Sequence, residues 1–205
     1  MFKIFDNKGM TLMEVMFGFS IFLVVIFGVF ALFRTSSQAD KNVWESTFVQ
    51  ATASKTVQRF VDELRTANYS TIGSYPLLTT TGTEIIFFAN IDGDSLMERV
   101  RYFVSGTTFM KGITKPTGDL LYSYNTSTEE ISALIYNLQT PLENIFTYYG
   151  ESYDGATNTS SMSYPIIMPL VRVVEIKLKI KQSNLADAPV FEIQSKAQLR
   201  NLKAN

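Results

Sequence analysis

The feature that most constrains this chain is a long apolar run near its N-terminus. Residues 10–33 form a run of 24 residues with one charged side chain, that of Glu14. As an α-helix such a run measures roughly 36 Å, which exceeds the hydrocarbon core of a bilayer, about 30 Å. Length and composition therefore predict a membrane-spanning helix. A carboxylate inside it is energetically unfavourable and marks a functional position.

The residues around the start of this run form a recognisable motif. Lys8-Gly9 is followed directly by Met10-Thr11-Leu12-Met13-Glu14-Val15. A short basic leader ending in glycine, then Thr-Leu, then Glu at the fifth position, resembles the N-terminal signal of type IV pilins and type II secretion pseudopilins. In that family a membrane peptidase cleaves after the glycine and methylates the new N-terminus. The resemblance implies cleavage between Gly9 and Met10 and N-methylation of Met10, although the family usually has Phe at that position.

Two other kinds of N-terminal segment compete with this interpretation. The apolar region of a cleaved secretory signal has about 7–15 residues and ends at small residues, whereas this run is longer and ends in Ala31-Leu32-Phe33. A plain signal anchor explains the length but neither Glu14 nor the polar block that ends at Gly9. The prepilin interpretation is favoured, and a signal-anchored surface protein that binds a partner outside any filament stays as an alternative.

Charge and composition predict where the protein is located and exclude several kinds of catalytic and metal site. Lys3 and Lys8 make the leader basic, which predicts a single-pass protein of the cytoplasmic membrane with its N-terminus inside. The exported part has 16 basic and 17 acidic residues, so it is not basic enough to predict a nucleic-acid partner. Cysteine and histidine are both absent, which excludes disulfides, histidine-based catalysis and nearly all zinc chemistry. We predict no enzyme and no cofactor.

The residues after the apolar run predict that the helix continues. Neither Gly nor Pro occurs between Gly28 and Gly73. Apolar residues recur there at spacings of three and four, which is typical of an amphipathic helix. We expect one helix over about 11–68, with its first half in the membrane and its second half under a sheet. The predicted apolar stripe comprises Val43, Trp44, Phe48, Ala51, Val57, Phe60, Val61, Leu64 and Ala67.

The rest of the chain predicts antiparallel β structure. Alternating or compact apolar runs predict strands, and Gly, Pro, Asn and Asp predict the turns between them. The predicted strands are 84–89, 99–104, 109–113, 145–149, 171–181 and 191–199, and the predicted loops are 69–82 and 151–164. Residues 128–138 fit a short helix or an edge strand. The fold class is α+β, with an antiparallel sheet of five to seven strands on the second half of the helix.

The resemblance extends beyond the motif. Residues 86–94, 98–102 and 198–202 are similar to minor pilins and J-type pseudopilins. This implies a pilin-like fold with a leader (1–9), a membrane and assembly segment (10–33) and an extracytoplasmic domain (34–205) that includes the helical residues 34–68. The implied function is that of a structural subunit, a minor pilin of a type IV pilus or related filament. A type II secretion pseudopilin at a filament tip is the alternative.

The same resemblance implies partners and a role for Glu14. The partners are other pilin or pseudopilin subunits, prepilin peptidase and the cytoplasmic membrane, and the final location is a cell-surface or periplasmic filament. Cleavage would free an α-amine on Met10, a group whose reference pKa is about 7.7–8.0. Glu14 would pair with that amine of a neighbouring subunit and so set the register of assembly. Snorkelling of Glu14 to the lipid headgroups is the alternative.

One further acidic motif lies in the predicted turn at residues 92–94. Asp92 and Asp94, with Asn90 before and Glu98 after, match part of a calcium loop, but Arg101 occupies the twelfth place, where a bidentate Glu is expected. A β-turn built from Asp and Gly explains the motif better. We therefore predict no metal site, with Asp92 and Asp94 as the weak candidates.

Overall fold

The computed structural model describes residues 9–118, 121–140, 144–182 and 189–199, without the side chains of 35–46. These residues divide into two compact units, 1–47 and 48–205, and each unit is described by itself. Of the predicted leader, only Gly9 is among the described residues. The link between the predicted strands 171–181 and 191–199 lies mostly outside them, and residues 200–205 lie wholly outside them.

A single α-helix, α1, spans Leu12–Arg65, which confirms the long N-terminal helix. It ends three residues before the predicted Asn68 because the chain turns there to reach the sheet. The N–H of Ala67 bonds the carbonyl of Leu64 in a tighter turn, 3.1 Å away, and the N–H of Asn68 already donates to the carbonyl of Phe88 at 2.9 Å.

Over residues 12–34 of the first unit, the exposed surface of the helix is mostly apolar. The segment Leu12–Arg34 has 23 residues and a mean hydropathy of 2.8, and none of its most apolar window is buried. By length and composition it can cross a membrane, a test that a signal sequence near the N-terminus also passes. Apolar residues around the whole circumference are typical of a helix that another apolar phase covers.

The second unit contains a five-stranded antiparallel sheet in the order β1-β2-β3-β4-β7. Its strands are β1 (Leu77–Thr80), β2 (Glu84–Ala89), β3 (Glu98–Ser105), β4 (Thr108–Thr114) and β7 (Glu130–Ile135). Strand β7 pairs with β4 at the edge of the sheet, so residues 130–135 form the edge strand rather than the helix. Strand β1 falls in the predicted loop 69–82, where pairing with β2 holds four residues extended.

The remaining long strands form a separate sheet, so the prediction of one sheet is wrong. Strands β8 (Phe146–Tyr149), β9 (Val173–Lys181) and β10 (Val190–Gln198) are antiparallel in the order β10-β9-β8. Among the described residues, no β-ladder joins the two sheets, and isolated backbone hydrogen bonds link them instead. The carbonyl of Gly82 accepts from the N–H groups of Ile145 and Phe146, and one bridge joins Leu138 to Ile180. A two-stranded ribbon, β5 (Pro116–Thr117) and β6 (Ser123–Tyr124), and two short 3₁₀ turns (Thr126–Thr128 and Met168–Leu170) complete the unit.

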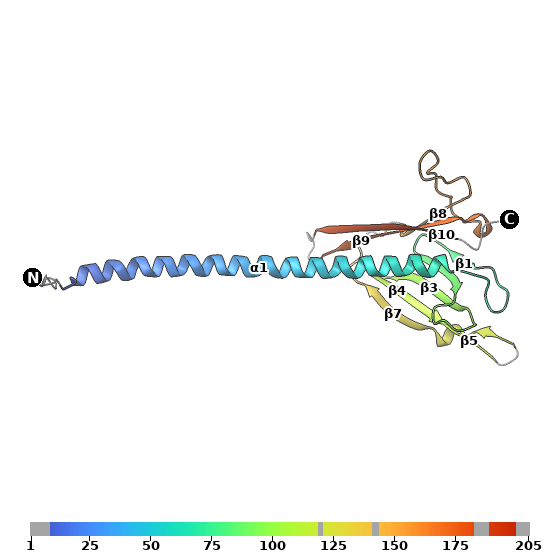
Figure 1. The fold of residues 1–205 in the computed structure, drawn as a ribbon, viewed down its shortest axis with the longest axis horizontal. Coiled ribbons are helices and arrows are strands. Elements are labelled where there is room, and N and C mark those ends of the chain that lie inside the picture. The colour runs from blue at the N-terminus through green and yellow to red at the C-terminus, as the bar shows by residue number, and fades with distance from the viewer. Residues whose placement is uncertain (1–8, 119–120, 141–143, 183–188, 200–205) are drawn as a thin grey trace, which may run out of the picture. The chain divides into compact units, whose positions relative to one another are not determined.

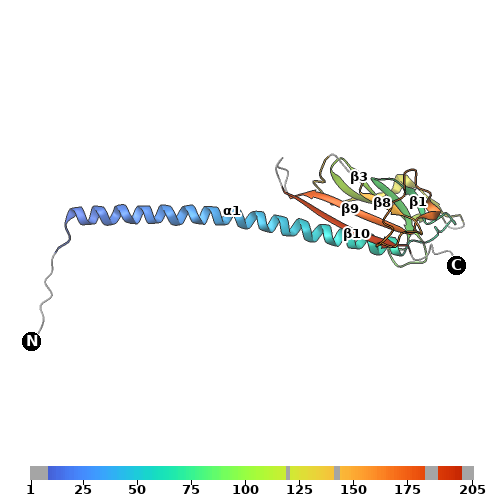
Figure 2. The same cartoon turned by 90° about the horizontal axis from the view of Figure 1, so that it is seen from above.

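The C-terminal part of α1 packs against both sheets (Figures 1 and 2). Phe60 is fully buried, and its ring contacts Tyr102 of β3 at 5.0 Å and Phe146 of β8 at 5.5 Å between centroids. The buried stripe of the helix consists of Ala53, Val57, Phe60, Val61 and Leu64. Phe48 and Ala51, which were predicted in this stripe, are exposed because the core begins only at the partly buried Val49 and at Ala53. The side chains of Val43 and Trp44 lie outside the described residues.

Candidate functional site

The predicted cleavage position lies immediately before α1. Gly9 and Met10 are exposed and outside the helix. Thr11 caps it: the carbonyl of Thr11 accepts from the N–H groups of Glu14 and Val15, at 3.1 and 3.2 Å, and its hydroxyl oxygen lies 3.4 Å from the N–H of Glu14. Thr followed three residues later by Glu is the capping-box pattern. The backbone at Gly9 and Met10 is therefore open to a protein that binds it, and ordered helix starts within two residues.

Glu14 is the only ionisable side chain among residues 9–33, and it is exposed. The other polar side chain well inside the segment, Ser20, donates its hydroxyl to the carbonyl of Met16 at 2.8 Å and so needs no outside partner. The carboxylate of Glu14 forms no ion pair within the described part of the chain. Its place in the first helical turn favours the negative charge by only about 0.3–1 kcal/mol.

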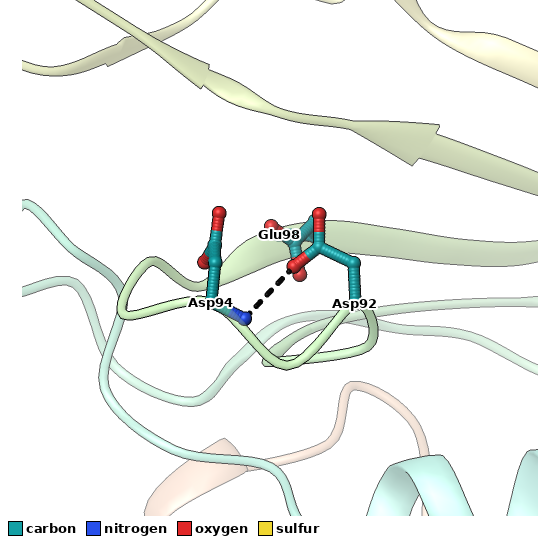
Figure 3. A group of neighbouring side chains, drawn as sticks. All are labelled: Asp92, Asp94 and Glu98. Carbon is teal, nitrogen blue, oxygen red and sulfur yellow. Dashed lines mark hydrogen bonds between the residues drawn. The ribbon is translucent and has the colours of Figure 1, made fainter.

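The second candidate region is residues 90–97, which join β2 to β3 and are called the acidic loop below. Gly93 has φ +83°, a conformation that favours glycine, and its N–H donates to the side-chain oxygen of Asn90 at 2.7 Å. The N–H of Asp94 lies 3.3 Å from a carboxylate oxygen of Asp92. This is the predicted turn, and the two weak candidate residues lie side by side in it (Figure 3).

The structure adds Glu98 to this pair. Glu98 is the first residue of β3 and is buried, with 1% of its surface exposed. Carboxylate oxygens of Asp92, Asp94 and Glu98 all lie within 4.8 Å of one another. Burial raises the pKa of Glu98, although the N–H of Ile91 donates to its Oε2 at 3.0 Å. Lys115 donates to Asp92 at 2.6 Å and lowers the pKa of that exposed carboxyl group.

A third cluster, which the sequence did not predict, joins α1 to the five-stranded sheet. Glu63 accepts from the ammonium group of Lys111 at 2.5 Å, from the hydroxyl of Tyr102 at 2.8 Å and from the guanidinium of Arg59 at 3.1 Å. Burial lowers the pKa of Lys111, and the Glu63 carboxylate opposes that shift. The signal was available: Lys111 lies two residues after Phe109, so strand alternation places both on the buried face.

These three regions differ in what they can do. The Glu63 cluster is satisfied within the domain and serves to fix the helix on the sheet. The acidic loop gathers three carboxylates, and the segment around Gly9 and Glu14 offers an open backbone and one unpaired charge.

No protein-family model matches the chain, and no curated protein matches it.

Proposed function

We propose that this chain is a structural subunit, a minor pilin, of a type IV pilus or related filament. Prepilin peptidase would process it between Gly9 and Met10 and methylate Met10. The observation that carries the proposal is the exposed apolar helix Leu12–Arg34, which follows Lys8-Gly9 almost directly and contains one carboxylate. A pilin needs a leader that ends in glycine, then an apolar helix with one carboxylate near its start.

The same helical surface would serve twice. Before assembly, lipid would cover the apolar side chains of residues 12–34, and after assembly the helices of neighbouring subunits would replace the lipid. Transfer between two apolar phases costs little, because neither exposes the side chains to water. A helix without internal burial is therefore suited to leave the membrane and enter a filament.

Glu14 would fix the register of that assembly. An unpaired ion in a low-dielectric environment costs several kcal/mol, far more than the gain of about 0.3–1 kcal/mol from the helix dipole. Pairing with the cationic N-terminal nitrogen of Met10 in a neighbouring subunit would remove that cost. Only one axial offset between helices brings the two groups together.

Mass spectrometry of the N-terminus, on membranes and on sheared filaments, tests the proposal. Wild type should begin at N-methylated Met10 in both fractions. Gly9→Val should retain the leader, because a side chain at the cleavage position blocks close approach to the backbone. Glu14→Ala should be cleaved and anchored but absent from filaments, with Glu14→Asp as the charge-conserving control. Uncleaved wild type, or normal incorporation of Glu14→Ala, would contradict the proposal.

A type II secretion pseudopilin at a filament tip would need the same processing. Residues 86–94 and 98–102 are similar both to minor pilins and to J-type pseudopilins, so this second candidate stays open. Co-purification of the crosslinked subunit with a secretion ATPase rather than a retraction ATPase would select it.

A further inference from the structure

Glu98 is an exception among the buried polar groups of the domain. Its Oε1 atom has no hydrogen-bond partner, and the only other buried side-chain oxygen in that condition, among the described residues, is the hydroxyl of Thr114. An unpartnered carboxylate oxygen costs more on burial than a hydroxyl. Ala89 lies opposite Glu98 in the ladder, so strand pairing gives no reason for an acid there. A buried oxygen of this kind needs an explanation, and a bound ion is one.

The surroundings of this oxygen are suited to a cation. The Glu98 carboxylate lies between those of Asp92 and Asp94 (Figure 3), and one oxygen from each is within 4.8 Å of the others. Calcium binds oxygens at about 2.3–2.6 Å, so two oxygens on opposite sides of the ion are about 4.6–5.2 Å apart. For magnesium the corresponding span is about 4.2 Å, with strict octahedral geometry.

We propose that Asp92, Asp94 and Glu98 bind a calcium ion at the acidic loop. All three ligands are carboxylates, which suit calcium rather than a softer metal. Asn90, Asp92, Asp94 and Glu98 occupy the first, third, fifth and ninth places of a calcium loop. Glu98 supplies, from the start of β3, the buried carboxylate that Arg101 cannot supply at the twelfth place. This inference is independent of the proposed filament role.

The loop is held in shape without the ion. The amide of Asn90 accepts from the N–H of Gly93 and donates to the carbonyl of Asp94. At the far end, the N–H of Met97 donates to the hydroxyl of Thr71 at 2.9 Å, and Tyr124 donates to the carbonyl of Met97 at 2.5 Å. A preformed site loses less conformational entropy when it binds its ligand.

Lys115, between β4 and β5, is the cation that competes for the acidic loop. It pairs with Asp92, but 60% of its side chain is exposed, so it can move into water at little cost. Its hydrogen bond goes to the exposed carboxylate of Asp92, so it does not pair with Glu98. Lys115→Gln should therefore strengthen calcium binding. This result would distinguish a calcium site from an acidic loop whose charge is neutralised by Lys115 alone.

The test measures thermal unfolding and calorimetric binding of the full chain in a non-ionic detergent. CaCl₂ would be raised to about 5 mM, above the range of about 10⁻⁴–10⁻³ M typical of weak calcium sites. The midpoint of unfolding should rise by about 3–6 °C when calcium exceeds Kd tenfold, and MgCl₂ should produce a smaller rise. Asp94→Asn should weaken calcium binding at least about tenfold, the loss seen even for residues that only support a metal ligand.

Glu98→Gln keeps the shape of the side chain and removes its charge. In EDTA this variant should be at least as stable as wild type, which shows that it folds, and it should lose the response to calcium. Asp154→Asn, in the separate loop at 151–164, is the matched control and should keep the response. A wild type that does not respond to calcium, or a Glu98→Gln variant that responds like wild type, would overturn the proposal.

Discussion

Residues 12–34 and residues 53–64 belong to the same helix, and both are rich in apolar side chains, but only the second set is buried by the domain. Phe22 has 57% of its surface exposed, whereas Phe60 has none. Burial of one such side chain contributes about 1.5–3 kcal/mol. The second half of α1 therefore stabilises the domain, and the first half leaves a large apolar surface exposed.

The acids of the two halves differ in the same way. Glu63 has three partners, Arg59, Tyr102 and Lys111, within the domain. Glu14 has no ion pair in the described residues. A charge that the domain neutralises serves the fold, and a charge that it leaves unpaired can serve an interaction.

The largest expected effect comes from truncating the buried half of the helix. Phe60→Ala should lower the free energy of unfolding by about 3–5 kcal/mol, because it removes the ring between the two sheets and leaves a cavity. Phe22→Ala is the matched control, and it should leave domain stability unchanged. Urea unfolding of the full chain in detergent, followed by tyrosine circular dichroism, measures both. A similar loss from the two variants would contradict the contrast between the halves.

The strands that the sequence predicted well have either a compact apolar run, as in the almost wholly buried β2, or a regular alternation. Strand β9 alternates between buried and half-buried side chains along its whole length, and one-sided burial is what period-two alternation reports. Strand β1 was missed because its four residues, between Pro76 and Thr81, are too few to show a pattern. The division into two sheets was also missed, because pairing partners depend on contacts distant in sequence, such as those of Gly82 with Ile145 and Phe146.

The candidate sites also differ in whether a local sequence pattern reveals them. The proposed cleavage and assembly residues Gly9, Met10 and Glu14 come from a contiguous motif, which needs no tertiary structure. Alternation with Val100 and Tyr102 in β3 indicates that Glu98 is buried, but the approach of its carboxylate to Asp92 and Asp94 depends on the folded shape of the acidic loop. The Glu63 cluster joins a helix to two strands. Strand alternation places Lys111 on the buried face, but no local pattern pairs it with Glu63.

The next effect in size concerns Glu63. Glu63→Gln should lower the free energy of unfolding by about 3 kcal/mol, because it leaves the buried ammonium group of Lys111 without a countercharge. Glu14→Gln should leave domain stability unchanged. Restoration of stability in Glu63→Gln by the second change Lys111→Met would confirm that the unpaired charge causes the loss. Equal stability of wild type and Glu63→Gln would show that the cluster does not hold the helix on the sheet.

The smallest effect concerns the hydroxyl of Tyr102. At pH 7, Tyr102→Phe should lower the free energy of unfolding by about 1 kcal/mol, the typical contribution of one hydrogen bond. The difference should depend on pH, because burial and the adjacent Glu63 carboxylate raise the pKa of Tyr102 well above 10 in the folded state. The unfolded chain ionises this residue near pH 10, so folding must retain a proton that the unfolded state has released.

The sign of the pH effect follows from that proton. A raised pKa contributes stability that is complete below the unfolded pKa, about 10, and that falls as the pH rises above it. At pH 11 wild type should lose about 1.4 kcal/mol relative to Tyr102→Phe, so that the two proteins become about equally stable. The other tyrosines cancel in this comparison because both proteins contain them. Paired urea unfolding at pH 7 and pH 11 measures the change, and a difference that stays constant would show that Tyr102 ionises while the domain is folded.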